Sequence, residues 1–343
     1  MTRRRVTQRE IARASGVSQT TVSLILAGDE SINVTEATRE RVLMTADALD
    51  YVPQAAARAL AKGRSHVIAL VLKDPHAQVF RDPFIPNVMT GITEVAGLQG
   101  FRLLIERIPA DADLSIVNSL LRGQQVDGAI LSSVHQHEET LSTLQRDGFP
   151  IVLLDSFEPL NFTVVGIDHL GGNRSAVSHL VRLGHQRIGC IPYVPLKQQH
   201  ILKRFSMYTQ VLAEAGLDVD MSIVVSGALE PETGASAMKK ILAHPHRPTA
   251  VFAMNDMMAL GALSACADAG VSVPNDIAIV GYDDMRFAAF TVPALSTVRA
   301  PEVELGRVSA ETLLAQIAGE PMQPKSRLLK TELIIRKSCG GRM

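Results

Sequence analysis

Hydrophobic positions follow two different periods along the chain, and the change falls near residue 67. Before it, apolar residues recur three or four positions apart, which is the spacing of one helix face. After it, short continuous apolar runs such as VIALVL and IAIVG alternate with helical segments. Continuous runs are typical of strands buried on both faces of a parallel sheet. The pattern therefore predicts an all-α head followed by an α/β core.

The α/β core contains too many predicted strands for a single subdomain with one sheet. The strand-like runs are VIALVL, FRLLI, DGAIL, IVLLD, TVVGI, RIGCI, IVV, TAVFA and IAIVG. We therefore expect two doubly wound parallel-sheet subdomains with a cleft between them. A final run, RLLKTELII, would complete one sheet. The expected boundaries are about 67–166 with 299–325 for the first subdomain, and about 167–298 with 326–340 for the second.

Two short helices joined by a tight turn are predicted in the segment VTQREIARASGVSQTTVSLILAG. Thr7 and Glu10 fit a capping box, which starts the first helix at Gln8. Gly16 ends that helix, and Ser18 can cap a second one. Apolar residues at helical spacing would pack the second helix on the first: Val22, Ile25 and Leu26.

A third helix is predicted from Glu36 to Leu49, with Thr35 as its cap and with Val42, Leu43 and Ala46 facing inward. The next segment, QAAARALAK at 54–62, is too short to be a stable helix alone in water. It is either a plain linker or a hinge helix that forms only when something holds it. The chain then divides into a head (1–53), a hinge (54–63) and a core (64–343).

The second helix of the head carries polar side chains that suit contact with DNA. Gln19, Thr20 and Ser23 point away from the first helix, where short hydrogen-bonding groups can meet base edges in the major groove. Five arginines supply local charge for phosphates: Arg3, Arg4, Arg5, Arg9 and Arg13. The alternative is a surface helical hairpin with a basic tail.

Composition restricts the remaining classes of function. The net charge of the 343 residues is −1, so nucleic-acid binding has to be local. Three widely spaced cysteines form no metal-ligand or disulfide pattern, and a reducing cytoplasm is expected. The basic N-terminus lacks the apolar region of a signal peptide, and no run is long enough to span a membrane. We expect no bound metal and no cofactor.

An enzymatic function is not expected from the motifs. A nucleotide-dependent enzyme on a doubly wound sheet needs a glycine-rich turn after the first strand. Here VIALVL is followed by KDPHAQ, which has no glycine. No nucleophile motif such as G-x-S-x-G supports a catalytic triad.

Seven motifs in order resemble signatures of the LacI family of bacterial transcription regulators. They are IARASGVSQTTVS, TRERV, YVPQAAARAL, HLVRLGHQRIG, NDMMALGAL, VPNDIAIVGYDD and PALSTV. The resemblance extends from Val6 to about Ile335. It implies a repressor that acts as a homodimer, whose two heads bind a near-palindromic double-stranded operator.

Carried over by position, the resemblance also implies which residues contact DNA. The major-groove residues are Ser18, Gln19, Thr20 and Ser23, and the DNA-backbone contacts are Thr7, Asn33, Thr35 and Thr38. Leu60 matches a leucine that family members insert into the minor groove, which kinks the DNA. The alternative for Leu60 is a core position of a linker helix. Leu24 stands where many members have arginine, so a guanine contact is not expected there.

The core resembles periplasmic sugar-binding proteins, which implies that a small effector binds in the cleft. Three residues match the family's effector-binding positions: Arg204, Asn255 and Asp283. Asn255 and Asp283 follow the runs TAVFA and IAIVG, at the strand ends where α/β proteins bind ligands. The alternatives are a surface arginine, a helix N-cap and a turn residue, respectively. Further candidates, with ordinary loop and core roles as the alternative, are Asp82, Phe84, Asp155 and Phe252.

The sequence leaves the effector's identity open. A sugar or a sugar derivative is expected from the resemblance. A nucleoside or purine acting as co-repressor is the alternative. A solute-binding protein for uptake also fits the two-lobed core, but it does not account for the helical head or for the missing signal peptide.

Overall fold

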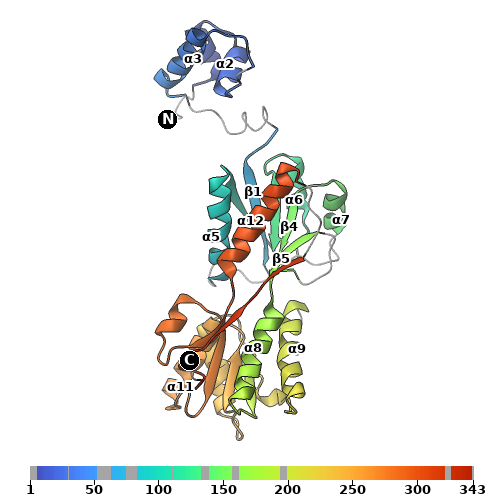
Figure 1. The fold of residues 1–343 in the computed structure, drawn as a ribbon, viewed down its shortest axis with the longest axis vertical. Helices are drawn as coiled ribbons and strands as arrows, with labels where there is room; N and C mark the ends of the chain where they lie inside the picture. The colour runs from blue at the N-terminus through green and yellow to red at the C-terminus, as the bar shows by residue number, and fades with distance from the viewer. Residues whose placement is uncertain are drawn as a thin grey trace. The chain divides into compact units, whose positions relative to one another are not determined.

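The computed structural model describes residues 6–29, 31–51, 63–74, 83–109, 111–132, 139–156, 162–193, 199–320 and 326–341. The chain forms two compact units. The first comprises 1–66 and 122–127, and the second comprises 67–121 and 128–343. Figure 1 shows the helical head of the first unit and the two sheets of the second.

The head contains the three predicted helices: α1 (Gln8–Ser15), α2 (Gln19–Leu26) and α3 (Glu36–Ala48). Each begins at a capping side chain that accepts a backbone N–H, which satisfies a group that the first helical turn leaves unpaired. The caps are Thr7, Ser18 and Thr35. The small core of the head consists of Ile11, Ala12, Val22, Ile25, Val42 and Ala46.

One inward-facing residue of the head was predicted wrongly. Leu43 is 46% exposed, whereas Val42 and Ala46 are buried. Residues 42 and 46 lie four apart and share one helix face, while residue 43 points about 100° away from residue 42.

The second unit begins with a six-stranded parallel sheet in the order β10-β5-β4-β3-β1-β2. Its strands are β1 (Val67–Asp74), β2 (Arg102–Pro109), β3 (Gly128–Ser132), β4 (Ile151–Leu154), β5 (Thr163–Ile167) and β10 (Ser326–Leu329). The helices of this half are α5 (Phe84–Leu98), α6 (Ser115–Arg122), α7 (Glu139–Arg146) and α12 (Glu302–Ala318). Every residue of β3, β4 and β5 is buried, as expected for strands covered on both faces.

Helices α5 and α12 lie side by side, although they are far apart in the sequence (Figure 1). A Cβ atom at Gly91 would lie 1.9 Å from the carbonyl oxygen of Val303. A Cβ atom at Gly306 would lie 2.0 Å from the carbonyl oxygen of Val88. Glycine at both positions therefore lets the two helix backbones approach closely.

The second sheet has five strands in the order β11-β9-β8-β7-β6. They are β6 (Ile188–Ile191), β7 (Ala250–Ala253), β8 (Ala278–Asp283), β9 (Ser296–Arg299) and β11 (Glu332–Ile334). Its α-helices are α8 (His169–Arg182), α9 (Gln199–Glu214), α10 (Pro231–Leu242) and α11 (Asp256–Asp268). Two short 3-10 helices complete this half, η1 (Met221–Ile223) and η2 (Arg286–Phe290).

The C-terminal run RLLKTELII departs from the prediction. It does not complete one sheet but contributes β10 to the first sheet and β11 to the second. Residues 326–329 thus belong with the first subdomain, which corrects the predicted placement of 326–340 in the second. In addition, β11 pairs antiparallel with β9, so the second sheet is not entirely parallel.

The run IVV was also expected to be a strand. Ile223 ends η1, and Val224 makes only an isolated bridge with Cys190. The carboxylate of Asp220 accepts the backbone N–H of Ser222 at 2.8 Å and caps this short helical turn instead. Three apolar residues are too few for their pattern alone to distinguish a strand from a turn.

Within the described ranges, no helix is both long and apolar enough to cross a membrane. Those ranges also contain no group of three or more His, Cys, Asp and Glu side chains arranged to hold a metal ion.

Candidate functional site

The N-terminus of α2 presents polar side chains on the surface of the head. Gln19 and Thr20 are exposed, and Ser23 is half-buried. Ser18 accepts the backbone N–H of Thr21 at 3.0 Å, and the two hydroxyl oxygens lie 2.8 Å apart. The predicted base-reading residues therefore lie within about one turn of each other, at the end of the helix where the dipole is positive.

The residues expected to contact the DNA backbone also lie on the head. Thr7, Asn33 and Thr35 are exposed, and Thr38 is half-buried. Thr7 and Thr35 each cap a helix, so their positions coincide with helix N-termini, whose N–H groups suit phosphate binding. Leu60, the hinge at 54–62 and Arg3 to Arg5 lie outside the described residues.

In the second unit, the structure brings Asn255 and Asp283 together at the ends of neighbouring strands. Asn255 follows β7, and its Oδ1 accepts the backbone N–H of Met257 at 2.8 Å as the N-cap of α11. Its Nδ2 donates to Oδ2 of Asp283 at 2.6 Å. Asn255 is therefore both a helix cap and a partner of Asp283, so its amide orientation is fixed from two sides.

Arg204 in α9 is buried and lies next to this pair. Its guanidinium donates to the carbonyl oxygen of Met254 at 3.1 Å and to the Tyr193 hydroxyl at 3.2 Å. It also stacks over the Tyr282 ring, 4.3 Å from the ring centroid. With 6% of its surface exposed, Arg204 is not the surface arginine that the sequence left as an alternative.

The charge of Arg204 is retained despite this burial. Burial alone lowers the pKa of the guanidinium, but nearby tyrosine and carboxyl groups outweigh it, so the pKa is raised above its usual value. Among the residues that the structure describes, Nε of Arg204 has no hydrogen-bond partner. A bound acceptor such as a hydroxyl or carbonyl group would satisfy it.

Asp155 joins the same region through His169. His169 Nε2 lies 2.8 Å from Asp155 Oδ2, and its Nδ1 lies 2.9 Å from the Tyr282 hydroxyl. Asp155 Oδ1 accepts the backbone N–H of Ile167 at 3.0 Å. Burial raises the pKa of Asp155, but the contact with His169 and the Ile167 bond outweigh it, so the pKa is lowered. Asp155 therefore stays ionised at neutral pH.

The other sequence candidates are placed less favourably. Phe252 is fully buried in β7 and belongs to the hydrophobic core, which is the alternative role that the sequence left open. Phe84, the first residue of α5, is partly buried and packs against the same core. Asp82 lies outside the described residues.

Three aromatic residues in this network were missed by sequence reasoning: Tyr193, His169 and Tyr282. Tyr282 directly precedes Asp283 in β8, and His169 directly follows the N-cap Asp168. Their positions after strands TVVGI and IAIVG were a usable signal, because the carboxyl ends of strands place residues near ligands.

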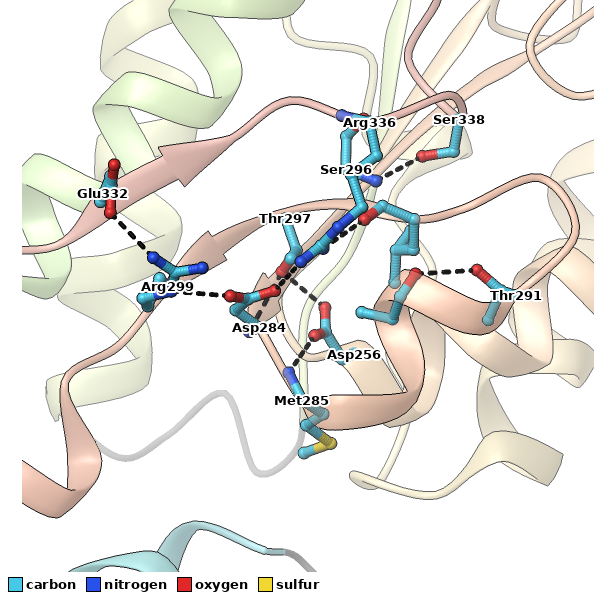
Figure 2. Close-up of polar contacts among 12 residues, drawn as sticks. Asp256, Asp284, Met285, Thr291, Ser296, Thr297, Arg299, Glu332, Arg336 and Ser338 are labelled. Atoms are coloured by element: carbon cyan, nitrogen blue, oxygen red, sulfur yellow. Dashed lines mark hydrogen bonds and ion pairs between the residues drawn. The ribbon is translucent and has the colours of Figure 1, made fainter. Parts of the chain in front are cut away.

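The backbone that carries Asp283 is held by a set of ion pairs shown in Figure 2. Asp283 and Asp284 have φ angles of 109° and 60°, which non-glycine residues rarely adopt. The Asp284 carboxylate accepts from Arg336 Nη2 at 2.6 Å and from Arg299 Nε at 2.8 Å. Arg299 also contacts Glu332 at 3.1 Å. These pairs fix the turn that follows β8.

Two family models match the chain. Residues 7–54 match "Bacterial regulatory proteins, lacI family", and residues 177–339 match "Periplasmic binding protein-like domain". The chain is 33% identical to the HTH-type transcriptional regulator CelR of Thermobifida fusca, over 98% of this chain and 99% of that protein. It is 34% identical to the HTH-type transcriptional repressor CytR of Escherichia coli K12, over 97% and 96%.

Solved structures of similar proteins cover almost the whole chain. A complex of the transcriptional regulator CelR with cellobiose has a TM-score of 0.71 at 31% identity and covers 97% of this chain and 100% of its own. A lac repressor dimer bound to operator and the anti-inducer ONPF has a TM-score of 0.85 at 25% identity and covers 98% and 99%.

Proposed function

Because the chain belongs to the lacI family of bacterial regulatory proteins, we propose that the site around Arg204, Asn255 and Asp283 binds a small polar effector that controls DNA affinity. The chain is a DNA-binding transcription regulator with a helix-turn-helix head and a periplasmic-binding-protein-like core. The identity of the effector and the residues that bind it are what we propose.

The observation that carries the proposal is the connected set of buried polar groups at the ends of β7 and β8. A guanidinium, an amide and a carboxylate lie together there, and Arg204 retains an unused donor at Nε. Buried polar groups without a partner are costly, so their presence indicates a ligand that completes them. The combination offers donors and acceptors for several hydroxyl groups at once.

We propose a sugar or a sugar derivative as the effector. The carboxylate and amide suit hydroxyl groups, and the half-buried Tyr193 adds aromatic surface next to the guanidinium. The similarity to the CelR–cellobiose complex supports this class. A nucleoside or purine acting as co-repressor is the second candidate, because an amide next to a carboxylate can also pair with ring nitrogens.

On the DNA side, we propose a repressor that acts as a homodimer on a near-palindromic operator. The similarity to the operator-bound lac repressor dimer supports this arrangement. Large apolar side chains exposed on the second unit, which a second copy of this chain would cover, include Leu98, Phe290 and Val292. The effector would act through the hinge at 54–62 and the minor-groove residue Leu60, in the cytoplasm and without catalysis.

A thermal-shift screen of the full chain tests the effector class. Cellobiose, glucose, ribose, adenosine, cytidine and hypoxanthine would each be added at millimolar concentration. A ligand that binds only the native state raises the melting temperature. A shift with a sugar that disappears in Asp283→Ala supports the proposal. Shifts with nucleosides alone would establish the second candidate, and an unchanged sugar shift in Asp283→Ala would place the site elsewhere.

A further inference from the structure

A fully buried carboxylate, Asp256, lies directly behind the pair formed by Asn255 and Asp283. It is the first residue of α11, next in sequence to Asn255, and it has no exposed surface. Its Oδ2 accepts the backbone N–H of Met285 at 2.9 Å, and its Oδ1 accepts the Thr297 hydroxyl at 2.7 Å (Figure 2). One side chain thus connects the start of α11, the turn after β8, and β9.

The neighbouring backbone of β8 packs closely against the Asp256 carboxylate. A Cβ atom at Gly281 would lie 2.1 Å from Asp256 Oδ1, so that position in β8 must be glycine for the carboxylate to reach the turn. The two residues that follow Tyr282 have positive φ angles. Such backbone persists only where surrounding bonds hold it. Asp256 supplies one of these bonds from inside the protein, and the Asp284 ion pairs supply others near the surface.

We infer that Asp256 is a positioning residue, whose ionised carboxylate holds the Asp283–Met285 turn against the start of α11 and thereby sets Asn255 and Asp283 for ligand binding. The consequence for a ligand rests on the proposed effector site. The effect of Asp256 on the turn does not depend on that proposal, because the turn is part of the protein with or without a ligand.

The hydrogen bonds show why the charge matters. Both oxygens of Asp256 act as acceptors, one from an N–H group that cannot reverse its role and one from the Thr297 hydroxyl. A proton on Oδ1 would point at Thr297 and force its hydroxyl to turn. Oγ1 of Thr297 also accepts the backbone N–H of Asp284 at 3.4 Å, so a turned hydroxyl would disturb that bond too. The bond from the Met285 N–H would weaken as well, because a neutral carboxyl group is a poorer acceptor than a carboxylate, so protonation would loosen the turn from two sides.

The burial of Asp256 places this change near neutral pH. Burial, with a smaller contribution from the Asp284 carboxylate, raises the pKa of Asp256 to about 7. Asp284 is itself paired with Arg299 and Arg336, and the Asp283 carboxylate is hydrogen-bonded to Asn255. We therefore expect the turn to be tight above pH 7 and looser below it.

Global stability should respond in the opposite direction, because global unfolding exposes the carboxyl group to water, whereas loosening of the turn leaves it buried. Because its pKa is raised above the ordinary value of 3.8, folded Asp256 binds a proton more tightly than the unfolded chain does between about pH 4 and 7. The stabilising contribution of that proton is present at low pH and is lost as the pH rises through 7. Asp256→Asn, which cannot ionise, should lack this dependence.

Hydrogen exchange of the unliganded full chain, followed by mass spectrometry, tests the inference without any effector. After correction for intrinsic exchange rates, the peptide that spans 281–286 should exchange at least fivefold faster at pH 6 than at pH 8 in the wild type. Asp256→Asn should exchange fast at both values. Asp276→Asn is the matched control, because that exposed carboxylate also accepts a backbone N–H, from Ser272 at 2.8 Å. It should behave like the wild type.

A pH-independent rate at 281–286 in the wild type would overturn the inference, even if Asp256→Asn fails to fold. Equal loss of protection throughout the second unit in Asp256→Asn would also overturn it, since that indicates a general structural role. A failed sugar screen would reject the proposed effector class and leave these exchange results unaffected.

Discussion

The head and the proposed effector site are each stabilised by hydrogen bonds, and the sequence separation of the bonded residues differs greatly between the two regions. In the head, each helix starts with a bond between residues three apart, as between Thr7 and Glu10. In the second unit, Asn255 contacts a residue 28 positions away, and His169 contacts one 113 positions away. Local bonds can form in a short segment, whereas the proposed effector site can form only when several strands and helices are assembled.

This difference implies that the two regions respond differently to destabilising substitutions. The head relies on a small apolar core, and small units are only marginally stable. The site in the second unit is supported by extensive strand pairing and by a large core. Loss of one side chain from the core of the head should therefore unfold the head and leave the second unit folded.

The largest expected effect is that of Ile11→Ala. Ile11 is fully buried in the head, and its truncation should cost about 2–5 kcal/mol of unfolding free energy. We expect the head to unfold and operator binding to disappear, while the main melting transition of the second unit stays unchanged. Calorimetry and a mobility-shift assay measure the two quantities.

Ile92→Ala is the matched variant in the second unit, where Ile92 is also fully buried. It should lower the main transition and leave the head folded. If either variant lowered the melting temperatures of both regions, the head and the second unit would unfold as one cooperative unit. That result would contradict the independent stability of the two regions.

Asp283→Ala should separate effector response from DNA binding. Binding of an effector can shift DNA affinity only by its preference between two conformations, typically about 1–3 kcal/mol. We expect that shift to vanish in Asp283→Ala, while DNA affinity without effector remains within about twofold of the wild type. Operator titrations with and without the sugar found by the thermal screen measure this.

Leu60→Ala should have the reverse effect: weaker operator binding and less DNA bending, with unchanged effector affinity. Asp276→Ala serves as a carboxylate control for Asp283. An Asp283→Ala protein that still binds the sugar and still responds would show that the effector site lies elsewhere.

The same difference in range explains what the sequence could predict. The caps Thr7, Ser18 and Thr35 were identified because their partners lie within one helical turn. The resemblance to a known family implies Asn255 and Asp283 as site residues, and the apolar strand that precedes each of them supports both predictions. Their mutual hydrogen bond depends on strand order, which the sequence pattern does not contain.

Residues whose roles depend on two distant contacts were not predicted. His169 follows an N-cap residue, and only the folded chain places it between Asp155 and Tyr282. The division of RLLKTELII between two sheets was missed for a similar reason. Its hydrophobic pattern is continuous, and the change of partner from β5 to β9 depends on where those strands lie.

A smaller effect is expected for Gln19→Ala on the surface of the head. Gln19 is exposed at the start of α2, so its truncation should leave the head folded. We expect the affinity for the cognate operator to fall by about 1–3 kcal/mol, with relaxed base preference at one position. Competition binding with operator variants measures both.

Arg9→Ala, also exposed on the head, is the comparison for Gln19. A phosphate contact should weaken all sequences alike and flatten the dependence of affinity on salt. If Gln19→Ala reduced binding to operator and random DNA equally, Gln19 would be a phosphate contact and not a base-reading residue.

The smallest expected effect on stability is that of Thr7→Ala, because within the head it removes only a local bond. The Thr7 backbone N–H donates to Glu10 Oε2 at 2.8 Å, and the Glu10 backbone N–H donates to Thr7 Oγ1 at 3.4 Å. Loss of the side chain should destabilise the head by about 1 kcal/mol and leave the main transition of the second unit unchanged. Thr7→Ser keeps the hydroxyl and should restore the stability of the head. Thermal unfolding followed by circular dichroism compares the three proteins, and a loss in Thr7→Ala as large as that in Ile11→Ala would mean that the caps, and not the apolar core, hold the head together.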